Sequence, residues 1–292
     1  MFHSGELMAQ RLAGFSTDSA AIYKTMPQQH RLFYAGLKQF FFSVADADCY
    51  PVAALLQGAP GFVQAIDDGH LRIATASLHN ALYLPPLRPG MRAGGLGLDF
   101  SNRRRNRVNG VIASVTAEFV TLAVEESFGN CANYIQRRSI AESDPQRLME
   151  LEYLSALDAD ARYLIAAADT CFIASRVQRE QAGGADISHR GGLPGFIELK
   201  NGRLQMVDYA GNRYMNTLGN LLLEPRCALL IMDFHQGNAL HIQGKAEINW
   251  QNTNEGERCL LIEPERILRI RQLLPAVGLE VEFAASTLAI RK

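Results

Sequence analysis

Short sequence elements of this chain occur twice at one constant spacing. Three matches lie 134 residues apart, with the first copy before the second: Pro60-Gly61-Phe62 and Pro194-Gly195-Phe196, Leu98-Asp99-Phe100 and Met232-Asp233-Phe234, and Gly110 and Gly244. Solenoid repeats have periods of about 20–50 residues. The longer spacing therefore predicts two copies of one fold unit, and polar residues that differ between the copies are those that folding alone does not require.

Short apolar or alternating runs separated by turn residues predict β-strands in both copies. The runs are 40–45, 52–56, 61–66, 71–76, 92–100 and 108–125 in the first copy, and 171–175, 185–190, 195–199, 204–207, 226–234, 239–249 and 258–270 in the second. Asn201-Gly202 predicts a type I′ hairpin turn. Helices are expected at 4–15, with Ser4 as N-cap, at 30–39 and at 158–168. The pattern predicts a mainly β protein with peripheral helices, built as sandwiches or barrels.

The charged segment 138–157, with a break at Ser143-Asp144-Pro145, predicts a connection between the copies. We therefore expect an N-terminal domain at 1–138, a linker and helix at 139–170, and a C-terminal domain at 171–292. A chain of 292 residues that is 48% hydrophobic and 20% charged suits two globular domains.

Composition and motifs exclude several classes of function. A net charge of −1 offers no general attraction to nucleic acid or to an acidic membrane. No apolar run reaches the roughly 18–20 residues of a membrane span, and the first residues lack a signal-peptide pattern. Five scattered cysteines without a CxxC pair predict reduced thiols, a cytoplasmic location and no bound metal. GxSxG, HExxH, Walker and GxGxxG motifs do not occur.

One predicted strand of the second copy is polar where the first copy is apolar. At the 134-residue spacing, its alternate residues Asp186, Ser188 and Arg190 correspond to Val52, Ala54 and Leu56. Alternate residues share one face of a strand. Burying such polar groups without partners would cost several kcal/mol, so this face either meets solvent or meets a polar ligand.

A second difference follows the run at 204–207. The second copy continues as Gly211-Asn212-Arg213-Tyr214-Met215-Asn216-Thr217, and a helix is expected to start at Asn216 or Thr217, as its cap, and to end near Leu223. Unpaired N–H groups at a helix start and an arginine fork suit a phosphate group. The first copy has Pro85-Pro86 here, which removes donors. The alternative is a capped connecting helix without a ligand.

These strings resemble the pyridoxamine 5′-phosphate oxidase-like, FMN-binding split-barrel family, in particular its branch of flavin-nucleotide-binding proteins. The strings are DISHRGGLPGF (186–196), GNRYMNTLGNLLLEPRCALLIMDF (211–234), LHIQGKAEI (240–248), LGLDFSNRRRNRVNG (96–110) and FGNCANYIQRR (128–138). The resemblance implies two tandem split β-barrels of Greek-key type, six strands each, paired two-fold with FMN at the barrel–barrel interface.

The resemblance also implies the cofactor contacts. Ser188 and Arg190 would approach the flavin or its phosphoribityl tail, with Asp186 orienting Arg190. The phosphate would be cradled by Asn212, Arg213, Asn216 and Thr217, with Asn220 as a further candidate that bonds within the helix. The C-terminal substrate segment of true pyridoxamine 5′-phosphate oxidases is absent, so vitamin B6 oxidation is not expected.

Three further segments each have two interpretations. Arg103–Arg107 is predicted as a solvated hairpin loop, and the alternative is that it reaches the flavin phosphate or an anionic substrate across the interface. Phe128–Cys131 either packs where the chain leaves the first copy or closes over the flavin ring. His189 is expected at the surface or the interface rather than as a general base.

The resemblance favours an FMN-dependent oxidoreductase with one flavin per chain, an unknown substrate and no assigned catalytic residue. The alternatives are a non-catalytic module that stores or senses flavin or heme, and a structural pseudo-dimer without a ligand. The expected partner is a small molecule, with no nucleic acid and no membrane. Pairing of the two halves within one chain and a homodimer of two chains both stay open.

Overall fold

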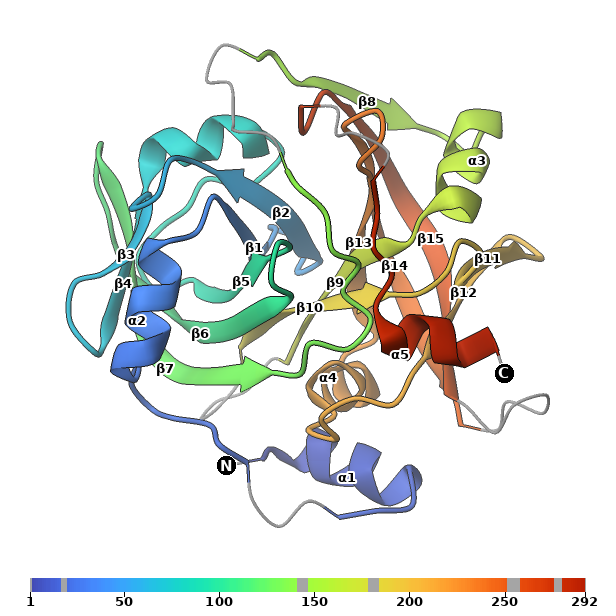
Figure 1. The fold of residues 1–292 in the computed structure, drawn as a ribbon, viewed down its shortest axis with the longest axis horizontal. Coiled ribbons are helices and arrows are strands. Elements are labelled where there is room, and N and C mark those ends of the chain that lie inside the picture. The colour runs from blue at the N-terminus through green and yellow to red at the C-terminus, as the bar shows by residue number, and fades with distance from the viewer. Residues whose placement is uncertain are drawn as a thin grey trace.

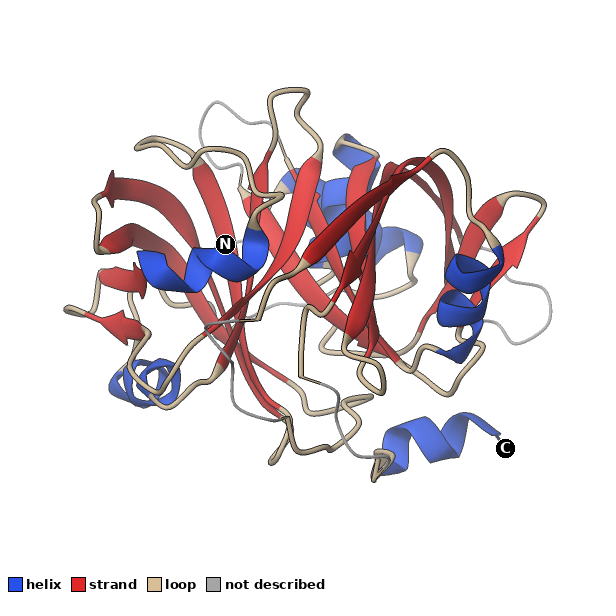
Figure 2. Cartoon of the chain, turned by 90° about the horizontal axis from the view of Figure 1, so that it is seen from above, coloured by secondary structure: helices blue, strands red, loops and turns tan. Residues whose placement is uncertain are grey.

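The computed structural model describes residues 2–16, 20–140, 147–177, 184–250, 258–275 and 280–291. Within them the protein is mainly antiparallel β, with two sheets side by side and a few short helices around them (Figures 1 and 2). The predicted break at Ser143-Asp144-Pro145 lies outside the described residues. Among the described residues, no helix combines the length and apolar character needed to cross a membrane.

The first sheet contains seven strands in the order β2-β1-β5-β6-β7-β4-β3. Their bounds are β1 (Gln39–Ala45), β2 (Pro51–Gln57), β3 (Val63–Ala65), β4 (His70–Ala74), β5 (Arg92–Asp99), β6 (Arg104–Val115) and β7 (Phe119–Asn130). The single run predicted at 108–125 is a hairpin, because the chain turns at Thr116, whose N–H donates to the Phe119 carbonyl at 2.8 Å.

The second sheet has the order β10-β9-β13-β14-β15-β12-β11. Its strands are β9 (Thr170–Arg176), β10 (Ala185–Gly191), β11 (Ile197–Lys200), β12 (Arg203–Asp208), β13 (Arg226–Asp233), β14 (Asn238–Asn249) and β15 (Arg258–Arg271). In addition, β8 (Glu150–Leu154), which the sequence did not predict, pairs with the end of β15. The two sheets thus repeat one strand order. In both, the outermost described strands do not pair with each other, so the sheets are not closed barrels.

The helices are short and peripheral. They are α1 (Ser4–Leu12), α2 (Gln28–Ala35), α3 (Ala159–Ala167), α4 (Asn216–Leu223) and α5 (Ala285–Leu288), with 3₁₀ turns η1 (Thr75–Ala81) and η2 (Ala289–Arg291). The helix predicted at 30–39 starts and ends earlier than expected, because the chain is already extended in β1 from Gln39.

Both predicted N-caps are wrong, because each helix is capped by a residue before the predicted one. The cap of α1 is His3, whose ring accepts from the Gly5 N–H at 3.1 Å while the Glu6 carboxylate accepts from the His3 N–H at 2.7 Å. This is a capping box with histidine in place of serine. The cap of α4 is Met215, which is left-handed (φ 63°) and makes no side-chain cap bond.

Repeated glycines occupy the same backbone geometry in both sheets. Gly110 and Gly244 each follow a register shift between strands, and a Cβ there would lie 2.0 Å from the Ala123 carbonyl oxygen and 2.1 Å from that of Glu263. A side chain cannot fit at either bulge.

The type I′ turn predicted between β11 and β12 is confirmed. Asn201 (φ 52°) and Gly202 (φ 78°) are both left-handed, and the two strands that they join are paired.

A third apolar core lies between the sheets, in addition to one inside each sheet. Phe41 stacks on Phe172 with ring centroids 3.5 Å apart, and Phe100 meets Phe234 edge to face at 5.3 Å. Phe41 and Phe172 are each third in their strands, and Phe100 and Phe234 are repeat counterparts. Because residues that meet their own counterparts lie on a two-fold axis, the two sheets face each other with pseudo-two-fold symmetry.

Candidate functional site

A cavity with about 570 Å³ of empty space, its open mouth included, lies between the two sheets. Its walls come from β6 and the end of β7 on one side, and from β10, β12 and the start of α4 on the other. Six of the seven sequence-predicted residues line it: Ser188, Arg190, Asn212, Arg213, Asn216 and Thr217. Asn220 does not, because its amide donates to Ser175 on β9 and accepts from His3.

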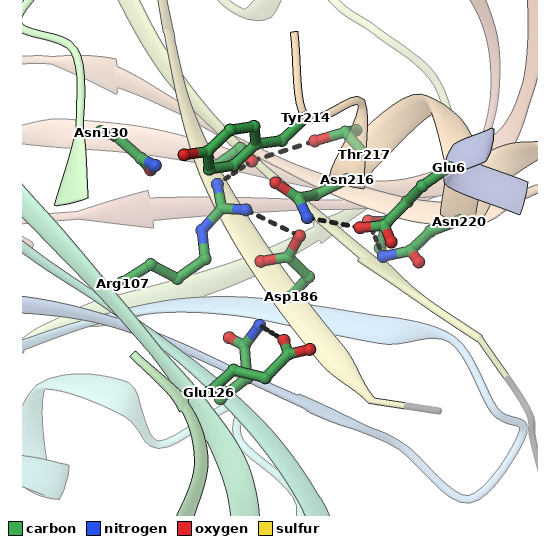
Figure 3. Close-up of polar contacts among 12 residues, drawn as sticks. Glu6, Arg107, Glu126, Asn130, Asp186, Tyr214, Asn216, Thr217 and Asn220 are labelled. Carbon is green, nitrogen blue, oxygen red and sulfur yellow. Dashed lines mark hydrogen bonds and ion pairs between the residues drawn. The ribbon is translucent and has the colours of Figure 1, made fainter. Parts of the chain in front are cut away.

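The polar face of β10 is buried against the first sheet. Arg107 of β6 donates one guanidinium nitrogen to Asp186 at 2.9 Å and another to the Ser188 hydroxyl (Figure 3). Arg107 and Asp186 are each only 4% exposed. Burial raises the pKa of Asp186, and the guanidinium opposes that rise. The face therefore meets neither solvent nor an apolar core, but a cation supplied by the other half of the chain.

Ser188 is held so that one donor remains. Its oxygen accepts from Arg107 and also from the Thr217 hydroxyl of α4, at 3.0 Å. A serine hydroxyl has one hydrogen and two acceptor sites. With both acceptor sites used, the Ser188 hydroxyl keeps its hydrogen as a donor.

Arg190 is held by Asp208 rather than by Asp186. The Asp208 carboxylate accepts from Arg190 at 2.6 Å and from Arg258 at 3.0 Å, which places three strands' side chains in one network. The orienting role that the resemblance implies for Asp186 is therefore wrong. The Arg190 Nε is buried without a hydrogen-bond partner among the described residues.

Arg105 also lines the cavity, and it is part of a strand rather than a loop. Its Nε donates to the Cys131 carbonyl at 2.8 Å, and loss of solvent lowers its pKa to about 10, which leaves it protonated at neutral pH. The solvated loop predicted for Arg103–Arg107 is thus wrong for Arg105 and Arg107. The repeat held a signal for both, because their counterparts in the second copy are Ala239 and His241.

His189 lies in the interface, 5% exposed, with its ring edge on Phe172. Neither ring nitrogen has a hydrogen-bond partner among the described residues. Burial, and then the guanidinium groups of Arg105, Arg138 and Arg190, hold the pKa of His189 well below its usual value. The imidazole is therefore neutral at physiological pH.

The cavity has a strong excess of positive charge. Five arginines line it, and the one carboxylate among its described lining residues is Asp208; the arginines are Arg105, Arg107, Arg190, Arg213 and Arg258. The chain enters α4 through two left-handed residues, Arg213 (φ 64°) and Met215 (φ 63°). The first N–H groups of a helix lack intrahelical partners, so the start of α4 adds donors to the guanidinium groups. This donor set fits an anion, and a phosphate in particular.

The symmetry-related place in the first half is closed by protein groups. Ala54 and Leu56 are fully buried in the apolar core, as the repeat comparison predicted. His241, the counterpart of Arg107, accepts from the Ala53 N–H at 3.1 Å, and burial lowers its pKa to about 4. Tyr83 donates its hydroxyl to the Ala53 carbonyl at 3.2 Å. Protein groups thus occupy the place in the first half that corresponds to this cavity.

No family model matches this chain, and no curated protein does. Several solved structures are distantly similar, including the following three. A candidate pyridoxamine 5′-phosphate oxidase from Lactobacillus delbrueckii is 15% identical over 40% of this chain and 98% of that one, with a TM-score of 0.30. An FAD-binding protein from Mesorhizobium loti is 12% identical over 41% and 96% (TM-score 0.28). The inhibitor of motility from Bacillus subtilis is 11% identical over 78% and 88% (TM-score 0.24). At these values the likeness assigns no site and no activity.

Proposed function

We propose that the cavity between the sheets binds FMN and that the protein is a flavin-dependent oxidoreductase with a substrate still to be identified. The observation that carries the proposal is the convergence of five guanidinium groups on the start of α4 and the Ser188 hydroxyl. Among the described residues, two carboxylates pair with them, Asp186 with Arg107 and Asp208 with Arg190 and Arg258. The flavin phosphate would be held by Arg190, Arg213 and Thr217. The resemblance of the sequence to flavin-nucleotide-binding proteins supports the same ligand.

The chain's own residues bind and orient the ligand in this proposal. Asp208 holds Arg190 in one position, so less side-chain entropy is lost on binding. Arg107 and Thr217 fix the direction of the Ser188 hydroxyl. Bound flavin supplies the redox chemistry, so a side-chain nucleophile is not required.

We further propose that the two halves are tandem copies and that the second carries the FMN site. The shared strand order, the two bulge glycines and the self-pairing phenylalanines support duplication. The first copy does more than cover the site, because it contributes Arg105 and Arg107 to it. The intramolecular pair would then replace the pair of chains that a single-barrel protein needs.

Flavin content of purified variants tests the proposal. We expect the wild type to carry one FMN per chain, and Arg190→Ala and Arg213→Ala to lose it while retaining the wild-type circular dichroism. Arg203→Ala is the matched control, because Arg203 is a partly exposed arginine of β12 that pairs with Glu247 and does not line the cavity. Full occupancy in both cavity variants would show that the site is misplaced.

A second measurement separates an enzyme from a binding module. The loaded protein is mixed anaerobically with NADH, with NADPH and with dithionite, and bleaching of the flavin is followed, then its reoxidation by an added acceptor. We expect a nicotinamide donor to reduce the flavin. Reduction by dithionite alone would instead favour storage or sensing.

A further inference from the structure

A second, larger cavity borders the first one. It contains about 1560 Å³ of empty space, its open mouth included, and Asn216 lines both cavities. Asp186 lines the second cavity and is paired with Arg107, which lines the first. This buried ion pair is therefore the wall between a cationic cavity and its neighbour.

The second cavity has the opposite charge. Four carboxyl groups line it, from α1, β7 and β10: Glu6, Glu125, Glu126 and Asp186. Two cationic side chains, Lys24 and Arg92, also line it, and Arg92 already pairs with Glu125. Figure 3 shows Glu6, Glu126 and Asp186 approaching from three different elements. Burial, together with mutual repulsion, raises the pKa values of Glu6 and Glu126.

Two buried acceptor oxygens in this wall make no hydrogen bond of ordinary geometry among the described residues, although the Ile187 N–H and the Asn109 amide act on Asp186 to lower its pKa. The Oδ1 atoms of Asp186 and Asn109 have no hydrogen-bond partner among the described residues, and the two residues are 4% and 8% exposed. The Asn109 amide nitrogen is used, since it donates to Glu126 at 3.2 Å. Buried acceptors without a hydrogen-bond donor are rare in proteins. Because Asp186 and Asn109 both line the cavity, a ligand in the cavity could donate to these two oxygens.

The size of this cavity and the side chains that line it suit an organic cation better than a bare metal ion. Among the described residues, no three His, Cys, Asp or Glu side chains are arranged to hold a metal ion. The carboxyl groups are instead spread around a volume that could contain a small organic molecule. An ammonium group offers three hydrogen-bond donors and no acceptor, which complements a wall with surplus acceptors.

We propose that this cavity binds an aliphatic polyamine, whose ammonium groups are held by Glu6, Glu126 and the free oxygens of Asp186 and Asn109. The proposal stands apart from FMN binding, because none of its carboxyl groups lines the flavin cavity.

Titration calorimetry of the purified protein with spermidine tests this proposal. We expect saturable binding of spermidine and none of 1,8-octanediol, a neutral molecule of the same chain length. Glu6→Gln and Glu126→Gln should each weaken binding about tenfold or more, because each removes a charged acceptor. Glu118→Gln should bind as the wild type does, because Glu118 is exposed in the turn before β7 and lies outside the cavity.

Folding and flavin content are recorded for every sample, so the two proposals fail separately. Absence of spermidine binding to a folded wild type, whatever its flavin content, would overturn this proposal alone. Wild-type affinity in both folded cavity variants, or equal heats with Mg²⁺ and with spermidine, would also overturn it.

Discussion

At the residue scale, a few positions account for the difference between the two halves. Four polar residues that line the cationic cavity correspond, at the 134-residue spacing, to apolar or neutral residues of the other half. Arg105 and Arg107 correspond to Ala239 and His241, and Ser188 and Arg190 correspond to Ala54 and Leu56. The backbone that carries them is the same in both halves. The difference between the two halves at this cavity therefore lies in side chains carried by sheets of the same strand order.

Glu6 should make stability depend on pH. Burial is the main cause that raises the pKa of Glu6 to about 7 from its ordinary 4.5. Between these values the folded state holds more protons than the unfolded state, so this group lowers stability as pH rises through that range. Glu6→Gln removes the charge and keeps one of the two acceptor oxygens that His3 and Asn216 use. Near pH 8 we expect the variant to have a higher melting temperature than the wild type and a free energy of unfolding larger by up to about 3 kcal/mol. Near pH 4 we expect the stability of the two proteins to be nearly equal.

Thermal melts of the wild type and of this variant across that pH range measure the effect. Parallel curves for the two proteins would contradict the assigned pKa.

Leu56→Ala should affect stability rather than ligand binding. Leu56 is fully buried in the apolar core of the first half, at the counterpart position of Arg190. Removing its side chain leaves a cavity that costs about 2–5 kcal/mol. Denaturant unfolding measures the loss, and FMN content of the folded variant should match the wild type. A stable variant without flavin would reverse the roles assigned to the two copies.

The sequence predicted the second-copy side of the cavity better than the first-copy side. Ser188 and Arg190 stand out because the repeat aligns them with apolar residues. Arg105 and Arg107 belong to an arginine-rich run that resembles a solvated loop when it is considered alone. Their burial depends on pairing with β5, in which Arg107 lies opposite Leu96, and on the approach of β10. Such long-range contacts leave no local pattern.

At the element scale, the sequence predicted that α1 exists but not where it packs. The helix lies against α4 of the second half (Figure 1), and the two cross at Gly5 and Gly219. A Cβ on Gly5 would lie 2.2 Å from the Gly219 carbonyl oxygen. Contact through glycines carries no hydrophobic periodicity, so the docking could not be predicted. Strand β8 was missed for a related reason, because it pairs only with the far end of β15.

Gly219→Ala should loosen α1 from α4. The added Cβ would lie 2.5 Å from the Glu6 backbone nitrogen, so the helices must separate, at a cost of about 1–3 kcal/mol. Hydrogen exchange should accelerate in α1, and the melting temperature should fall. Gly211→Ala is the control, since nothing lies within 4 Å of its Cβ position. Equal exchange in α1 of both variants would show that the close crossing does not hold the helix.

At the scale of the whole molecule, the two halves are joined by more than a linker. The N-terminal helix packs on the second half, and the segment 280–291 returns to contact residues 134–137 through Gln136, which donates to Thr287 at 3.1 Å. The domain boundaries predicted at 138 and 171 stay a prediction. The third core contains residues of both sheets, and β8, which lies inside the predicted linker, pairs with β15 of the second sheet.

Phe172→Ala should weaken the whole molecule rather than one half. The ring is fully buried and stacks on Phe41 across the interface, and its loss should cost about 3–5 kcal/mol. Because the interface core is shared, we expect one calorimetric transition in the wild type.

Phe40→Ala removes an equally buried ring from the core inside the first half and is the matched control. The Phe172 variant should also bind FMN more weakly, since Arg107 and Ser188 meet across the same interface, whereas the folded control should not. Two separate transitions in the wild type would mean that the halves fold independently, and unchanged FMN affinity in the Phe172 variant would mean that the site does not need their close contact.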